Sequence, residues 1–191
     1  MAKLLLLRHL ESQWNKENRF TGWTDIPLSQ EGIESAKETA LKLADFEINK
    51  VYTSPLVRNM QTVYLILKNL GKKDLPIVID KALDERNYGR LQGLNKNEVK
   101  RQYGEEQVKL WRRGWDDAPP EGESLKDVYN RVVPLYEEQI EKDLKAGKNV
   151  LVVASHNSLR ALMKHIESIP DEQIINLEIP TGGLREYDIT A

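Results

Sequence analysis

The segment Lys3-Leu-Leu-Leu-Leu-Arg-His9 places a continuous apolar run directly before two basic side chains. An unbroken apolar run of this kind is typical of a strand that is covered on both faces of a sheet. A second run, Asn149-Val-Leu-Val-Val-Ala154, ends just before another histidine, His156. Three shorter runs predict further strands at Lys50 to Thr53, Pro76 to Ile79 and Leu184 to Ile189.

Helical patterns lie between these strands, and two of them carry capping residues. Ser29 is a candidate N-cap for a helix to about Leu43, and Gly71 is a candidate C-cap for a helix from about Leu56 to Leu70. Two further helices are expected at Glu123 to about Leu144 and at Ser158 to about Ile166. Strands that alternate with helices predict an α/β fold, a three-layer α/β/α sandwich with a mostly parallel central sheet. We expect residues 1–191 to form one domain.

The composition argues against several classes of protein. The 191 residues carry a formal net charge of -2, without the strong basic excess of a general nucleic-acid-binding protein. Cysteine is absent, which excludes disulfides and thiolate sites and fits a reducing compartment. The run Leu4 to Leu7 is too short for a membrane span or a signal peptide. We therefore expect a cytoplasmic protein that binds neither nucleic acid nor membranes.

Polar side chains follow three of the apolar runs directly. They are Arg8-His9, His156-Asn157 and the segment Ser54 to Arg58. Because ligand sites in open parallel sheets lie at the carboxyl ends of the strands, we expect these three segments to meet at one rim of the sheet.

The residue types at this rim indicate phosphoryl transfer through His9. Neutral imidazole is a good nucleophile near physiological pH, and Arg8 and Arg58 offer planar forks that suit phosphate oxygens. A protonated His156 would add another charged donor. Arginine beside His9 disfavours a cation, so we expect no metal. The leaving oxygen needs a proton, and Glu85 is the best candidate for that general acid and base.

The neighbours of these residues form longer motifs. Arg8-His9-Leu10 is similar to the Arg-His-Gly signature of the histidine phosphatase superfamily. Five further blocks lie at Gln13 to Asp25, Asp84 to Lys96, Tyr103 to Gly114, Asn157 to Leu162 and Glu178 to Gly182. Together these motifs resemble the cofactor-dependent phosphoglycerate mutases of that superfamily over nearly the whole chain.

This resemblance implies the interconversion of 3-phosphoglycerate and 2-phosphoglycerate in glycolysis and gluconeogenesis. His9 would carry the phosphoryl group after priming by 2,3-bisphosphoglycerate, without a metal, and Glu85 would give and take the proton. The residues expected around the transferring phosphate are Arg8, Arg58, His156, Asn157, Ser12, Asn15, Thr21 and Gly22. The residues expected to hold the carboxylate and the second phosphate are Arg86, Tyr88, Lys96, Arg112 and Arg113.

The chain departs from the family pattern at two places in the site. Leu10 replaces the signature glycine, and its backbone would be strained if the position required a positive φ. Ser155-His156-Asn157 lacks the glycine that usually follows the second histidine of the family. We expect His156 to take the place of that second histidine. The long insertion that relatives often carry between Pro120 and Glu123 is missing, so both a monomer and a homodimer stay open.

Three functions are compatible with these residues. The stretches Asn87-Tyr88 and Arg112-Arg113 favour the mutase. A broad-specificity histidine phosphatase on the same scaffold would instead pass the phosphoryl group to water. A catalytically impaired phosphoester-binding homologue is the third alternative, and Leu10 is the reason to consider it.

Overall fold

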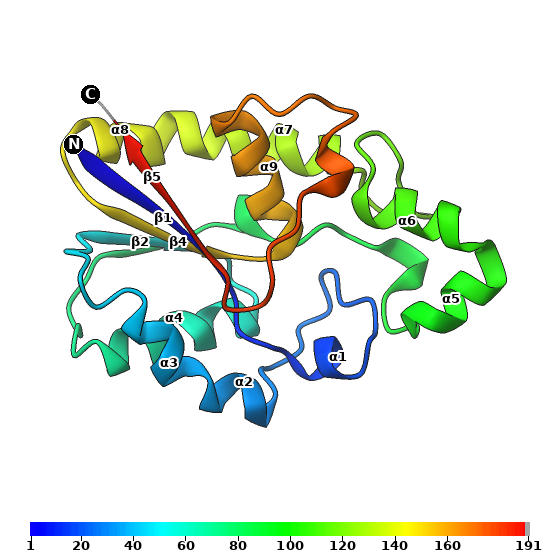
Figure 1. Cartoon of the computed structure of the whole chain (residues 1–191), viewed down its shortest axis with the longest axis horizontal. Coiled ribbons are helices and arrows are strands. Elements are labelled where there is room, and N and C mark those ends of the chain that lie inside the picture. The colour runs from blue at the N-terminus through cyan, green and yellow to red at the C-terminus, as the bar shows by residue number, and fades with distance from the viewer. Residues whose placement is uncertain (190–191) are drawn as a thin grey trace.

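A computed structural model describes residues 1–189, which fold around a five-stranded sheet (Figure 1). The strands are β1 (Ala2–Arg8), β2 (Lys50–Thr53), β3 (Ile77–Ile79), β4 (Val150–Ala154) and β5 (Leu184–Ile189), in the order β3-β2-β4-β1-β5. The first four are mutually parallel, and β5 runs antiparallel to β1. All five predicted strands and the mostly parallel sheet are confirmed.

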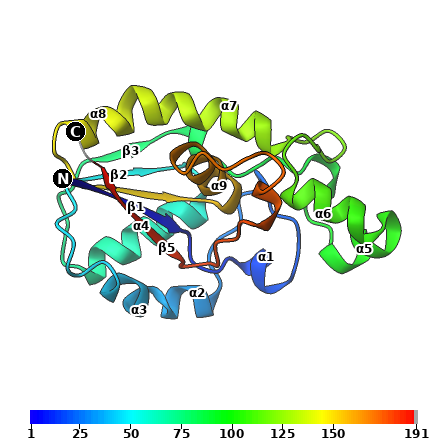
Figure 2. The same cartoon turned by 45° about the horizontal axis from the view of Figure 1, so that its top comes forward.

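The central strand β1 packs into two separate cores because its side chains alternate between the two faces of the sheet. Leu4 and Leu6 join a core with α7 (Leu125–Leu135) and α9 (His156–Ile166). Leu5 and Leu7 join a second core with α3 (Ala36–Leu41) and α4 (Val57–Asn69). Helices therefore cover both faces, as both views show, and the predicted three-layer arrangement is confirmed (Figures 1 and 2).

The predicted helices are present, and two of them are interrupted. Ser29 caps α2 (Gln30–Glu34), and the Ser35 hydroxyl donates to the Gly32 carbonyl where α2 gives way to α3. Gly71 follows α4 with φ +66°, so its predicted capping position is confirmed. The long third helix consists of α7, a π-helical turn (Tyr136–Ile140) and α8 (Glu141–Lys145), and it contains Pro134, which lacks the N–H that an α-helix needs.

Two helices that the sequence analysis did not predict extend beyond one end of the sheet (Figure 2). They are α5 (Lys96–Tyr103) and α6 (Glu105–Arg113), and Gly104 with φ +86° separates them. Their few apolar residues pack with Phe20 and Tyr88 in a small core of their own. The remaining short elements are α1 (Gln13–Lys16) and 3-10 turns at Lys81–Leu83, Gly89–Leu91 and Ile174–Asn176. Within residues 1–189, every helix is too short or too polar to cross a membrane.

Candidate active site

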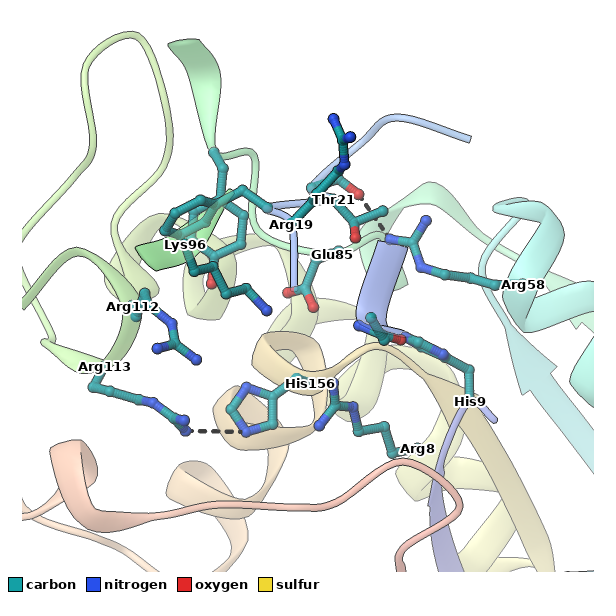
Figure 3. A pocket seen from close by; sticks show the side chains of 14 residues that line it. Arg8, His9, Arg19, Thr21, Arg58, Glu85, Lys96, Arg112, Arg113 and His156 are labelled. Carbon is teal, nitrogen blue, oxygen red and sulfur yellow. Dashed lines mark hydrogen bonds between the residues drawn. The ribbon is translucent and has the colours of Figure 1, made fainter. Parts of the chain in front are cut away.

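A pocket opens where the carboxyl ends of β1, β2 and β4 meet the loops that follow them (Figure 3). It is lined by Arg8, His9, Asn15, Arg19, Phe20, Thr21, Gly22, Arg58, Glu85, Tyr88, Lys96, Arg112, Arg113 and His156. The three chain segments that were expected at one rim therefore do meet there. Six of the lining residues are arginine or lysine, and Glu85 is the one lining residue that carries a carboxylate.

His9 is held rigidly at the end of β1. Its backbone N–H donates to the Ala154 carbonyl on β4 (3.1 Å), and its ring Nδ1 lies 2.6 Å from the Leu10 carbonyl. A carbonyl oxygen only accepts, so Nδ1 carries the proton and Nε2 keeps its lone pair. Burial, followed by the charges of Arg58 and Arg8, lowers the pKa of His9 well below its ordinary value. The imidazole is therefore neutral, the form that can attack phosphorus.

Arg8 and Arg58 place two guanidinium groups beside His9; Arg58 is fully buried, and Arg8 is half-buried. Arg8 donates to the Ile179 carbonyl (2.6 Å), and its Nε has no hydrogen-bond partner among residues 1–189. Arg58 donates to the carbonyls of Gly22 (2.7 Å) and Thr24 (3.1 Å). Because these acceptors are neutral, the positive charge of both side chains is left to act on an anion in the pocket.

The loop around α1 supplies further polar groups to this end of the pocket. Asn15 Oδ1 accepts from the N–H (3.0 Å) and the hydroxyl (2.9 Å) of Ser12, so its Nδ2 is left to donate. Ser12 was expected around the transferring phosphate, but it caps α1, is fully buried and does not line the pocket. The buried Thr21 hydroxyl has no partner within the described chain.

Gly22 brings the backbone itself to the pocket. It adopts φ +56°, and a Cβ at this position would lie 2.1 Å from Gln92 Oε1. A side chain would therefore be strained by the backbone conformation and would also displace the Gln92 side chain.

Glu85 faces the pocket and is fixed by donors from behind. Its Oε1 accepts from the backbone N–H of Arg86 (2.7 Å) and from both the N–H (3.1 Å) and the Nδ2 (2.9 Å) of Asn157. Asn157 Nδ2 also lies 3.1 Å from the Tyr88 hydroxyl. Asn157 was expected to line the pocket, but the start of α9 turns it behind the lining, where it holds the carboxylate instead.

The backbone of the Glu85 loop is clamped from outside. The Glu85 carbonyl accepts from Trp23 Nε1 (2.6 Å) and from Arg131 (2.9 Å). Arg131 also donates to the carbonyls of Ala82 and Asp84 and pairs with Glu123. The loop that presents Glu85 is therefore held by two side chains that lie outside the pocket lining.

His156 is the first residue of α9 and lines the pocket next to Arg113 (Figure 3). Arg113 NH1 lies 3.4 Å from His156 Nε2, and a guanidinium only donates, so the proton of the ring is on Nδ1. Burial, then Arg8, Arg160 and the other nearby arginines, lowers the pKa of His156 well below its ordinary value. In the free protein His156 is thus a neutral donor, not the charged one considered from sequence.

The opposite side of the pocket is built by α5 and α6. Lys96 begins α5, and Arg112 and Arg113 end α6; Arg113 pairs with Glu178. Burial, followed by the charges of Arg112 and Arg8, lowers the pKa of Lys96 to about 8. This side of the pocket therefore presents three closely spaced cations.

Arg86 was expected among these cations, but the structure places it behind them. Its guanidinium is fully buried and donates to the carbonyls of Trp111 and Gly114 at the end of α6. Arg86 therefore supports the helix that carries Arg112 and Arg113, and it does not line the pocket.

Leu10 does not disturb the site. Its φ is not in the left-handed region, and its side chain packs away from the pocket with Leu28, Ala36 and Leu65. The backbone N–H of Leu10 donates to the Thr62 hydroxyl (3.1 Å), and its carbonyl orients His9. The position therefore does not require a positive φ, and the strain that such a requirement would have caused does not arise.

Two lining residues were missed from sequence. Arg19 lies next to Thr21 in the pocket lining and donates to the Gly93 carbonyl (3.0 Å), and Phe20 packs on Tyr88 with ring centroids 5.0 Å apart. Their position directly before Thr21 and Gly22 was the available signal.

Comparisons with known proteins agree with this geometry. The sequence model of the histidine phosphatase superfamily (branch 1) matches residues 4–191. A 2,3-bisphosphoglycerate-dependent phosphoglycerate mutase of Cytophaga hutchinsonii is 44% identical over 100% of this chain and 89% of its own length. A protein of the same name from Lachnoclostridium phytofermentans is 47% identical over 98% of this chain and 86% of its own length.

Solved structures share the fold at lower identity. A mycobacterial hydrolase superposes with a TM-score of 0.87 at 24% identity, over 97% of this chain and 88% of its own. The alpha-ribazole phosphatase of Shigella flexneri gives a TM-score of 0.81 at 26% identity, over 98% of this chain and 91% of its own. The family match over nearly all residues, the mutase relatives and the histidine pocket agree, and the chain belongs to the 2,3-bisphosphoglycerate-dependent phosphoglycerate mutases of the histidine phosphatase superfamily.

Proposed function

We propose that this protein interconverts 3-phosphoglycerate and 2-phosphoglycerate through a phosphohistidine at His9. One observation carries the proposal: the neutral His9 ring and the Glu85 carboxylate line one pocket whose other charged lining residues are six cations. A nucleophile, a proton carrier and cationic donors are the groups that phosphoryl transfer between hydroxyls requires. The names of the relatives support the same reaction.

The pocket also suits 2,3-bisphosphoglycerate as the priming donor. Arg8 Nε and Thr21 Oγ1 are buried polar atoms without a partner among residues 1–189, and Lys96 and Arg112 add charge at the other side. Two phosphates and a carboxylate would find separate donors on these residues. When bound, 2,3-bisphosphoglycerate supplies the phosphoryl group that primes His9.

In this proposal His9 and Glu85 divide the chemistry. Nε2 of His9 forms the bond to phosphorus as the ester oxygen leaves, while Glu85 gives a proton to that oxygen. In the return step Glu85 takes the proton from the attacking hydroxyl, the N–P bond breaks and the imidazole is neutral again. Arg8 and Arg58 stabilise the charge on the equatorial oxygens in both directions.

The cations on α5 and α6 favour a mutase over a phosphatase. A phosphatase needs to hold one phosphate and release its product, whereas a mutase must retain a more highly charged species while it reorients. Lys96, Arg112 and Arg113 supply the additional charge for this retention.

The decisive experiment follows 2-phosphoglycerate and free phosphate after 3-phosphoglycerate is added with and without 2,3-bisphosphoglycerate. Stimulated isomerisation with little phosphate release is expected. Release of phosphate without isomerisation would instead identify a phosphatase. The absence of both, together with no acid-labile phosphate on His9, would leave a binding protein.

A further inference from the structure

A third buried arginine lies behind the pocket on α9. Arg160 is fully buried and donates only to neutral oxygens. These acceptors are Asn157 Oδ1 (2.9 Å) and the carbonyls of Leu177 (3.0 Å), Arg113 (2.8 Å) and Ile174 (2.5 Å). None of the acidic side chains of residues 1–189 forms an ion pair with it. A buried charge without a counter-ion is costly, and here the hydrogen bonds to four neutral oxygens offset that cost.

The bond from Arg160 decides which way the Asn157 amide points. An asparagine side chain has one accepting oxygen and one donating nitrogen, and a guanidinium has no acceptor. Oδ1 therefore faces Arg160, which turns Nδ2 toward Glu85 Oε1 (2.9 Å) and the Tyr88 hydroxyl (3.1 Å). With the amide reversed, the Oδ1 lone pairs would face the carboxylate of Glu85, and the donor would be lost.

The same guanidinium joins two other parts of the site. The Arg113 carbonyl belongs to the last residue of α6, whose side chain lines the pocket. Leu177 lies two residues before Ile179, whose carbonyl accepts from Arg8. Arg160 does not line the pocket itself, so it reaches substrate only through the residues that it holds.

We propose that Arg160 is a positioning residue for proton transfer: it fixes the Asn157 amide so that its nitrogen donates to the Glu85 carboxylate. This inference rests on the proposed function, because it takes Glu85 as the group that moves the proton. Separately, the hydrogen bond from Arg160 to the Arg113 carbonyl holds the end of α6, whose Arg113 side chain lines the pocket.

A double-mutant cycle tests the proposal. Asn157→Ala removes the donor and should lower kcat about 10- to 100-fold, the usual effect of losing a hydrogen bond to a charged group. Arg160→Met should lower kcat to a similar extent, because the amide is then free to reverse. The Arg160→Met/Asn157→Ala double variant should stay within about 3-fold of Asn157→Ala, because both changes act on one donor. Arg160→Lys, which still donates, should recover part of kcat.

The controls separate positioning from general loss of structure. Met163→Ala empties a fully buried site on the same helix without touching Asn157, and it should leave kcat unchanged at a temperature where it is folded. If Arg160→Met does not fold, the cycle is run with Arg160→Gln, whose neutral amide can donate or accept and so does not force Asn157 Oδ1 to face it. The proposal would be overturned if the losses in kcat of the two single variants multiplied in the double variant. It would also be overturned if Arg160→Met changed KM and left kcat unchanged.

The proposal on Arg160 and the proposed function fail in different experiments. If the wild-type enzyme releases phosphate and does not isomerise, the mutase assignment fails, and the same cycle is then measured on phosphate release, which also needs the proton carrier. If the wild-type enzyme isomerises while the cycle shows additive losses, only the role of Arg160 is wrong.

Discussion

The two sides of the pocket are built in different ways. The strand side consists of Arg8 and His9 at the end of β1 and of Arg58 in the first turn of α4, and backbone carbonyls hold each of the three side chains. The helix side, Lys96, Arg112 and Arg113, comes from two short helices beyond the sheet, where all three side chains are half-buried. Among the described residues, the side chains of Lys96 and Arg112 have no hydrogen-bond or ion-pair partner, although the Lys96 backbone N–H donates to the Asn18 carbonyl. Rigid positioning thus coincides with the reacting centre, and looser positioning coincides with recognition.

The largest expected effect is at the strand side. His9→Ala removes the nucleophile, so turnover should fall by about 10⁴-fold or more, and acid-labile phosphate should no longer form. Labelling with 2,3-bisphosphoglycerate followed by acid treatment measures this. His165→Gln, at the histidine that contacts Tyr129 outside the pocket, is the matched control and should label normally. Retained labelling of His9→Ala would contradict the assignment of the nucleophile.

Glu85→Gln should have the second largest effect. The amide keeps the shape of the side chain but does not carry the proton, so kcat should fall about 10²- to 10⁴-fold. The KM for 3-phosphoglycerate should change little, because Glu85 is not among the cations that hold the substrate. Steady-state kinetics with bisphosphoglycerate in excess measure both constants. An unchanged kcat would remove Glu85 from the mechanism.

A matched pair of arginine substitutions compares the two sides directly. Arg58→Met should lower kcat by about 10- to 100-fold, because charge develops on the phosphoryl oxygens beside it in the transition state. Arg112→Met should instead raise KM by about 10-fold while kcat stays within a few-fold. Arg101→Met, on α5 and outside the pocket lining, is the control. The same kcat and KM pattern for Arg58→Met and Arg112→Met would show that the two sides do not divide the work.

The smallest expected effect concerns pH at the helix side. Burial lowers the pKa of Lys96 to about 8, so the free enzyme loses this charge as the pH rises through 8. An anionic substrate binds the charged form, and KM should therefore about double from pH 7 to pH 8, where half of the charge is lost. Lys96→Arg stays charged and should flatten the profile. A pH dependence that survives this substitution would place the titrating group elsewhere.

The strand side could be predicted from the sequence, and the helix side only in part. Arg8 and His9 directly follow an apolar run, and strand ends in a parallel sheet share one rim, so their meeting follows from general rules. The helices that carry Lys96 and Arg112 pack on a small local core with few apolar residues, which gives a weak periodic signal. Their place beside the pocket follows from tertiary contacts between distant segments.

Three arginines that donate to backbone carbonyls mark the same limit. The sequence does not distinguish the surroundings of Arg86, Arg131 and Arg160 from those of other charged residues in loops or on helix faces. In the structure, however, their guanidinium groups donate to backbone carbonyls of other segments. Arg86 was predicted to bind substrate and instead supports α6. A carbonyl partner carries no residue-type signal, because every residue has one.

By itself, the sequence determined the five strands, the mostly parallel sheet and the position of His9 at a strand end, because apolar runs and strand ends follow local rules. It also contained the phosphoglycerate mutase motifs. Only the tertiary structure decided that Leu10 points away from the pocket, that His156 is neutral and that Asn157 holds Glu85. The physical reason is that side-chain direction, burial and charge environment depend on residues far away in the chain, which local patterns do not encode.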